Sequence, residues 1–155
     1  MAIEEITDDR IRALTEMHKS VVNPDARRRT EMKYERVNYE VSGDSASDKF
    51  QIFLRQSTVD PEDFSCGIRW LMPSGESLIL ARYNGANHVH DDIRFTFHIH
   101  RATEAAIKRG FKPERHAEVT PRYRTLAGAL HCLLADFNVS GLDSPQDQPE
   151  LFDET

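Results

Sequence analysis

The chain has 155 residues, of which 39% are hydrophobic and 30% are charged, and its formal net charge is −6. This composition predicts one domain with a modest apolar core, and the negative charge argues against a general nucleic-acid binder. No apolar run is long enough to span a membrane, and the acidic N-terminus lacks a signal-peptide pattern. We therefore expect a cytoplasmic protein with no membrane partner.

The N-terminal region predicts a helix from Asp8 to about Val22. An aspartate at position 8 or 9 is a suitable N-cap, and the segment Asn23-Pro24-Asp25 is a suitable stop. The apolar residues that repeat at helical spacing are Ile11, Leu14, Met17 and Val21.

Four runs of alternating apolar and polar residues follow this helix. They predict strands over residues 33–41, 50–56, 64–72 and 77–83. Because the connections between them are short, we expect an antiparallel meander. A fifth strand is predicted over residues 94–100.

Two helices are predicted after the fifth strand. Thr103 is a suitable cap for a short helix over residues 104–109, and Thr125 is a suitable cap for a final helix. The fold class is therefore α+β. We expect a five-stranded, mainly antiparallel sheet, with an N-terminal helix, a short helix after strand five and a C-terminal helix packed on one face. Residues 1–140 would form this single domain, and residues 141–155 an acidic, disordered tail.

The charge is unevenly distributed along the chain. Residues 94–124 contain eight Arg or Lys residues against three Glu, whereas the segment from Asp143 to the end contains five acidic residues and no basic residue. A basic segment in an acidic chain indicates an anionic partner for that segment, unless its charges are balanced by neighbours in three dimensions.

Two His-x-His triplets, at residues 88–90 and 98–100, are the most informative motif. In a strand, alternate side chains share a face, so His98 and His100 would lie together with Thr96 on a solvent-exposed face. Phe95, Phe97 and Ile99 would point to the other face. Imidazole titrates near neutral pH and also binds metals, so this pair is the best candidate for chemistry in the chain.

Three interpretations of the histidines remain open. A zinc site could use the four triplet histidines with Asp91 or His116, although the surrounding charges are mostly basic. Cleavage of RNA through its own 2′-hydroxyl, without a cofactor, needs a base, an acid and cations for the phosphate. A non-catalytic domain that assembles with itself or with a protein partner needs neither a metal site nor an active site.

For RNA cleavage, the sequence predicts two groups of residues. Histidine suits the proton transfers, and the planar guanidinium of arginine suits phosphate. The expected catalytic residues are His98, His100, Arg82 and Arg101. The expected substrate-binding residues are Tyr83, Asn84, His88, His90, Arg115 and His116.

The segment from Arg82 to His100 resembles the signature of TumE-type toxins from bacterial toxin–antitoxin pairs. The resemblance rests on Arg82-Tyr83-Asn84, on the loop histidine His88 and on the triplet that ends at His100. It implies an antiparallel sheet, a growth-inhibiting activity directed at RNA and a DNA-binding antitoxin as partner. A neighbouring bacterial family that shares the sheet but not the activity is the alternative.

Overall fold

The computed structural model describes residues 2–86, 89–90, 93–94 and 96–142, and of residues 89–90 and 93–94 only the backbone. The helices are η1 (Ile3–Glu5, a 3₁₀ turn), α1 (Asp8–Glu16), α2 (Glu104–Lys108) and α3 (Leu126–Asp136). The strands are β1 (Lys19–Val21), β2 (Arg29–Glu31), β3 (Tyr34–Ser42), β4 (Lys49–Ser57), β5 (Phe64–Leu71), β6 (Ser77–Asn84), β7 (Val89–His90), β8 (Ile93–Arg94), β9 (His98–Arg101), β10 (His116–Val119) and β11 (Val139–Ser140).

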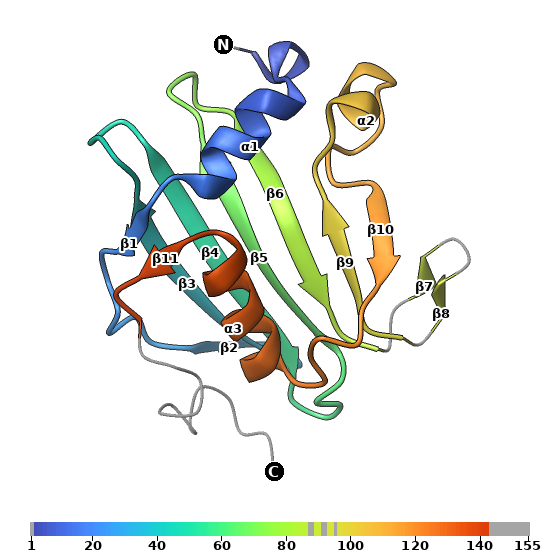
Figure 1. Ribbon diagram of the computed structural model, residues 1–155. Coiled ribbons are helices and arrows are strands. Elements are labelled where there is room, and N and C mark those ends of the chain that lie inside the picture. Colours follow the sequence, from blue (N-terminus) through green and yellow to red (C-terminus); the bar gives the residue numbers. More distant parts are fainter. Residues whose placement is uncertain (1, 87–88, 91–92, 95, 143–155) are drawn as a thin grey trace.

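One large sheet dominates the described part of the chain (Figure 1). Its strands lie in the order β10-β9-β6-β5-β4-β3-β1-β11, with β2 also paired to β3, and β7 and β8 form a separate pair. All neighbours are antiparallel except β1 and β11. The α+β class and the antiparallel meander of β3 to β6 are confirmed.

The prediction of five strands is wrong, because the large sheet has nine strands among the described residues. The additional strands are β1, β2, β10 and β11, each of four residues or fewer. Strands this short carry too few residues for an alternating pattern to be recognised. Strand β10 also lies at an edge and is largely exposed, so it has no buried face to mark it.

The first helix is shorter than predicted. It ends at Glu16, and Lys19–Val21 forms strand β1 beside β3 and β11. Val21 fits the helical repeat in the sequence, but in the structure it packs as part of a strand with a buried-exposed-buried pattern. The N-caps predicted for the two later helices are confirmed, because the hydroxyl oxygens of Thr103 and Thr125 accept from Ala106 N and Gly128 N.

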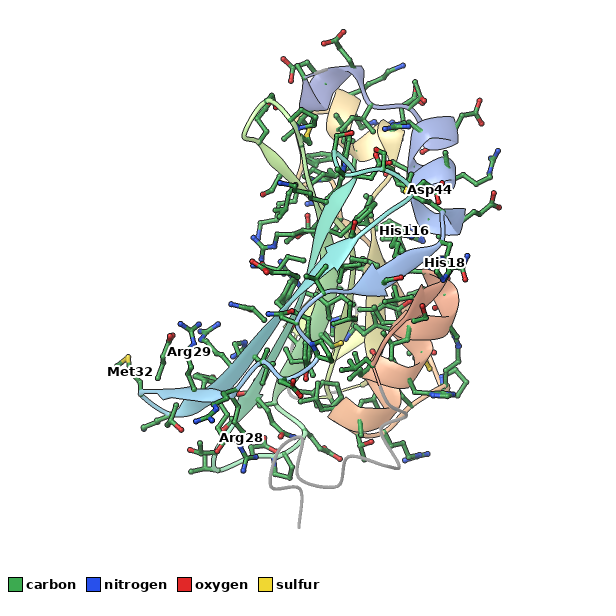
Figure 2. All side chains as sticks on the ribbon, turned by 90° about the vertical axis from the view of Figure 1, so that its left-hand side faces the viewer. His18, Arg28, Arg29, Met32, Asp44 and His116 are labelled. Atoms are coloured by element: carbon green, nitrogen blue, oxygen red, sulfur yellow. The ribbon has the colours of Figure 1, made fainter. Side chains whose placement is uncertain are left out.

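The core lies between the sheet and helices α1 and α3, which both cover the same face (Figures 1 and 2). The guanidinium of Arg10 on α1 lies over the Trp70 ring of β5, with 5.2 Å from Cζ to the ring centroid. Leu130 and Leu133 on α3 are fully buried. Leu142 also packs against this core, so ordered contacts continue two residues into the segment expected to be a tail.

The opposite face of the sheet, here called the open face, carries none of the described helices (Figure 2). No described helix is long and apolar enough to cross a lipid bilayer. Because side chains alternate along each strand, one side of the sheet is apolar and covered by α1 and α3, whereas the open face carries mostly polar side chains.

Candidate functional site on the open face

Two rows of side chains cross the open face from β4 to β9. Residues that are paired across antiparallel strands have Cβ atoms roughly 4.5–5.5 Å apart, so members of a row are direct neighbours. The first row is Arg55, Ser65, Asn84 and His98, and the second row is Phe53, Gly67, Arg82 and His100.

His98 and His100 lie side by side at the β9 end of these rows. Their ring centroids are 5.1 Å apart and the rings meet edge to face, at 71°. They share the open face, as the alternation predicts, and Phe97 on the other face contacts Phe64 and Tyr123. The expectation that both rings are exposed is wrong, because His98 is 0% and His100 is 7% exposed.

The contacts of the two rings fix their neutral tautomers. His98 Nδ1 lies 2.9 Å from the carbonyl oxygen of Thr96, and His100 Nδ1 lies 3.1 Å from that of Glu114. A carbonyl oxygen can only accept, so Nδ1 carries the proton in each ring. In the neutral ring, Nε2 then holds the lone pair.

A pocket of about 300 Å³ opens on the same face beside the histidines. Its walls come from three neighbouring strands, β4, β5 and β6. The lining residues are Phe53, Arg55, Ser65, Arg82 and Asn84. The pocket thus combines one aromatic ring, two guanidinium groups and two uncharged hydrogen-bonding groups.

Each guanidinium of the pocket is held by a carboxylate. Arg82 donates to Glu114 across 3.1 Å, and Arg55 lies 3.6 Å from Asp63. Arg55 also lies over the Tyr34 ring, 4.4 Å from its centroid, and the Tyr34 hydroxyl donates to Asp63. These contacts orient the guanidinium planes before any ligand arrives. Because guanidinium has five donors, each group retains donors beyond those used on its carboxylate.

The hydroxyl of Tyr123 supports the site from the other side of the sheet. It lies 2.9 Å from the carbonyl oxygens of both Asn84 and His98 and donates to them. The ring is buried in the core against Tyr83 and Phe64. This contact joins the backbones of β6 and β9 at the point where the site residues lie.

The structure places Arg101 and Tyr83 on the face covered by helices, away from the histidine pair. Arg101 pairs with Ala81 and lies 3.3 Å from Glu118. The Tyr83 hydroxyl donates to Asp136 on α3. Burial, and then the bond to Asp136, raises the pKa of Tyr83 well above its usual value. Neither residue is brought together with Arg82, Asn84 and His100.

The remaining predicted residues are distributed as follows. Arg115 and His116 are exposed near and on β10, where the Arg115 guanidinium lies 4.4 Å from the centroid of the Phe111 ring. His88 and Asp91 lie outside the described residues, and of His90 only the backbone, in β7, is described. Within the described part of the chain, no three His, Cys, Asp or Glu side chains are grouped as a metal site. Cys66 and Cys132 are both free and buried.

Sequence reasoning missed Phe53, Arg55, Ser65 and Glu114. The first three occupy the outward positions of strands β4 and β5, whose inward positions pack in the core. The signal that could have identified them was the set of outward positions in the same alternating patterns, on the strands that neighbour the histidines.

The comparisons with known proteins found no relative of this chain. No protein-family model, curated protein or solved structure matches the chain.

Proposed function

We propose that this protein is an RNA-directed toxin of a toxin–antitoxin pair and cleaves RNA without a metal ion. The single observation that carries the proposal is the pair of adjoining imidazoles, 5.1 Å apart, next to a pocket lined by two guanidinium groups. Cleavage through the 2′-hydroxyl needs a base for the 2′ proton, an acid for the leaving 5′ oxygen and cations at the phosphate.

Arg55 and Arg82 are the proposed phosphate ligands. They face the same pocket from β4 and β6, with Ser65 on the intervening strand β5 and Asn84 two residues after Arg82 on β6. Planar guanidinium groups bind two phosphate oxygens at once, and they stabilise the negative charge that grows on the phosphorane. Their carboxylate partners hold them in place, which lowers the ordering that substrate binding requires.

His100 is the proposed proton carrier. It is the direct neighbour of Arg82 across β6 and β9, and its Nδ1 is held by the Glu114 carbonyl. Nε2 then takes the proton of the 2′-hydroxyl. The 2′ oxygen attacks phosphorus, the bond to the 5′ oxygen breaks, and that oxygen takes a proton from water in the pocket. A cyclic 2′,3′-phosphate is the expected product.

The resemblance of residues 82–100 to TumE-type toxins supports the biological part of the proposal. Arg82, Asn84 and His100, which carry that resemblance, lie together on the open face. We propose a bacterial cytoplasmic toxin with RNA as substrate and an antitoxin protein as partner.

The test is cleavage of a labelled single-stranded RNA in the presence of EDTA. His100→Ala and Arg82→Ala should each slow cleavage by about a hundredfold or more, the usual contribution of such groups. Arg101→Ala is the matched control, because it removes an arginine from the other face and should leave the rate within a few-fold of wild type.

Two further results discriminate the chemistry. A substrate with a 2′-deoxy sugar at the cleavage site should remain intact, and products should end in a cyclic phosphate. The proposal fails if EDTA abolishes cleavage, if the deoxy substrate is cut, or if the purified protein leaves RNA intact.

A further inference from the structure

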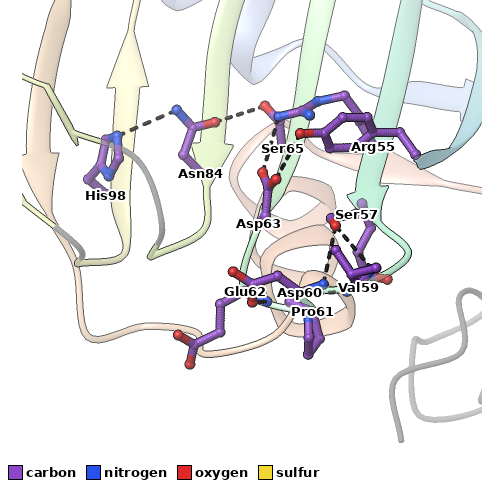
Figure 3. A network of polar contacts seen from close by, with 12 residues as sticks. Arg55, Ser57, Val59, Asp60, Pro61, Glu62, Asp63, Ser65, Asn84 and His98 are labelled. Atoms are coloured by element: carbon purple, nitrogen blue, oxygen red, sulfur yellow. Dashed lines mark hydrogen bonds and ion pairs between the residues drawn. The ribbon is translucent and has the colours of Figure 1, made fainter. Parts of the chain in front are cut away.

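A row of arginines extends the first row of the open face from β4 outward to β2. Arg29 on β2 pairs with Arg36 on β3, and Arg36 pairs with Arg55 on β4. Arg55 pairs in turn with Ser65, and Figure 3 shows Arg55, Ser65 and Asn84 at the pocket end of this row. Because cross-strand partners share a face, the three arginines lie on the open face. Neighbouring strands are roughly 4.8 Å apart, so the arginines span roughly 10 Å.

The arginine row is accessible from solvent along its length. The side chains are 58% exposed at Arg29, 41% at Arg36 and 21% at Arg55. Met32, in the turn between β2 and β3, is 97% exposed. Figure 2 shows Met32 and Arg29 at the end of the hairpin that lies farthest from the body of the molecule. The row therefore begins on an exposed hairpin and ends in the wall of the pocket.

The hairpin that carries the outer part of the row is basic, although the chain as a whole has a net charge of −6. Residues 27–36, here called the basic hairpin, contain five basic residues and two glutamates. The basic residues are Arg27, Arg28, Arg29, Lys33 and Arg36. A local excess of positive charge in an acidic chain indicates an anionic ligand for that segment.

The arginine row has a cost for the folded protein. Like charges that lie directly opposite each other on neighbouring strands destabilise the pairing. Glu31 lies 3.5 Å from Arg29 and 3.1 Å from Arg36, and Asp63 lies 3.6 Å from Arg55. Two carboxylates are thus paired with the three guanidinium groups of the row. An anion bound along the row would balance the remaining positive charge.

The ion pairs of the outer row leave it able to bind phosphate. Glu31 is 49% exposed, and ion pairs between exposed side chains contribute little to stability. A phosphate can therefore replace Glu31 at Arg29 and Arg36 at small cost. The planar guanidinium group also offers five donors and binds two phosphate oxygens at once.

We infer that the basic hairpin is a second binding site for RNA, at which Arg29 and Arg36 hold phosphates of the strand that leaves the pocket. The ligand is the sugar–phosphate backbone, so the hairpin binds single-stranded RNA irrespective of its base sequence. The continuity of the row with Arg55 favours the substrate strand itself over a separate molecule. The path of the strand into the pocket rests on the proposed function. The binding of phosphates at the hairpin does not.

Fluorescence anisotropy with 2′-O-methyl RNA tests binding separately from cleavage, because this RNA has no 2′-hydroxyl to attack phosphorus. The variant with both Arg29→Gln and Arg36→Gln should bind a twelve-nucleotide single strand about tenfold more weakly than wild type at about 0.1 M salt. The slope of log K against log salt should fall in magnitude by about 1.4, because each phosphate contact on a single strand contributes about 0.7.

Two matched variants show whether the effect is local. Arg12→Gln combined with Lys108→Gln removes the same charge from exposed side chains on α1 and α2 that are also paired with carboxylates, and should bind within about twofold of wild type. Glu31→Gln removes the carboxylate that competes with phosphate and should tighten binding about threefold or more. Glu118→Gln removes an equally exposed partner of an arginine, away from the row, and should not.

Cleavage of unmodified RNA relates the hairpin to the pocket. The double arginine variant should lower kcat/KM about tenfold on the twelve-nucleotide strand. It should stay within about twofold of wild type on a dinucleotide, which is too short to reach the hairpin from the pocket. Equal losses on the two substrates would show that the hairpin does not hold the departing strand.

The inference is overturned if the double arginine variant binds RNA as the Arg12 and Lys108 control does. It is also overturned if polyglutamate displaces the RNA as effectively as unlabelled RNA, because the hairpin would then fit an acidic protein. A tighter complex with Glu31→Gln cannot result from misfolding, so this variant keeps the test decisive. RNA binding that depends on Arg29 and Arg36 without any cleavage would refute the proposed function alone. If the wild-type protein neither binds nor cleaves RNA, both fail.

Discussion

The ammonium group of Lys19 donates a hydrogen bond to the carbonyl oxygen of Phe137 across 2.7 Å, although the two residues are separated by most of the chain. The same group donates to Thr15 O and Met17 O, at 3.0 and 2.8 Å. Lys19 is fully buried, and Nζ also lies 5.1 Å from the centroid of the Phe50 ring. One cation therefore joins the end of α1 and the end of α3 beside strand β1, where helix carbonyls favour positive charge.

Lys19→Met should destabilise the protein by about 2–4 kcal/mol, because it leaves buried carbonyl oxygens without a donor while keeping most of the apolar side chain. The measurement is the free energy of unfolding in urea. Lys112→Met, at an exposed loop position, is the control and should change stability by less than about 0.5 kcal/mol. Equal effects of the two substitutions would show that the Lys19 contacts contribute little.

Asp136 links α3 to both the sheet and the preceding loop. It accepts from Arg122 at 2.8 and 2.9 Å and from the Tyr83 hydroxyl. Burial raises the pKa of Asp136, but the bonds from Arg122 and Tyr83 outweigh it, so the pKa lies below its ordinary value of 3.8. The carboxylate therefore stabilises the folded state above that pH, and the contribution is lost as the pH falls through the folded-state pKa.

Asp136→Asn should cost about 2 kcal/mol at neutral pH, the range for hydrogen bonds to a charged group. The stability difference from wild type should shrink as the pH falls below about 3.8. Urea unfolding across the acid range measures this. Asp9→Asn, at a side chain that is 87% exposed, is the control. A difference that stays constant or grows in acid would contradict the assignment.

Gly67 leaves room for the Phe53 ring on the pocket wall. A Cβ at this position would lie 2.3 Å from Phe53 Cζ and 2.8 Å from the Ala81 carbonyl oxygen. Gly67→Ala should therefore destabilise by about 1–3 kcal/mol and displace the ring from the pocket. A double-mutant cycle with Phe53→Ala measures the clash, because removing the ring should recover part of the loss. Strictly additive effects would mean that the ring does not rest on Gly67.

Tyr123→Phe should loosen the pairing of β6 and β9 at the site. Removing the hydroxyl takes one donor from the buried carbonyls of Asn84 and His98 and should cost about 1–2 kcal/mol. Amide hydrogen exchange should accelerate in β9 more than in β3. Tyr39→Phe removes another buried hydroxyl, on β3, and should not accelerate exchange in β9. Uniform acceleration would indicate general destabilisation only.

The elements with a long apolar face were predictable from the sequence. Strands β3 to β6 alternate over eight or nine residues each, and α2 and α3 begin at threonine caps. The end of α1 was not predictable from spacing, because Met17 and Val21 fit a helical repeat as well as a turn and a strand. The strand at Lys19–Val21 is held by its pairing with β3 and β11 and by the bond from Lys19 to Phe137 O, and these contacts with distant residues are not indicated by any local pattern.

The candidate site was predictable only in part. Alternation correctly places His98, His100 and Arg82 on one face. The same rule puts Arg101 and Tyr83 on the other face, although the site expected from the sequence includes both. Ser65 joins the site by pairing with Asn84, 19 positions away, and Arg55 joins it by pairing in turn with Ser65. The two imidazoles are buried by tertiary packing, which no pattern in the sequence indicates.

The placement of β11 has a consequence for biosynthesis. Strand β1 leaves the ribosome early, yet its parallel partner at Val139–Ser140 and the α3 helix that covers β5 and β6 are made more than a hundred residues later. A nascent chain that stops before α3 exposes the apolar side of the sheet and lacks the Phe137 carbonyl that receives Lys19. The contacts of α3 with the sheet, of Lys19 with Phe137 and of β1 with β11 can thus form only after residue 140 has been translated, so incomplete translation products lack a closed core and are better substrates for proteolysis.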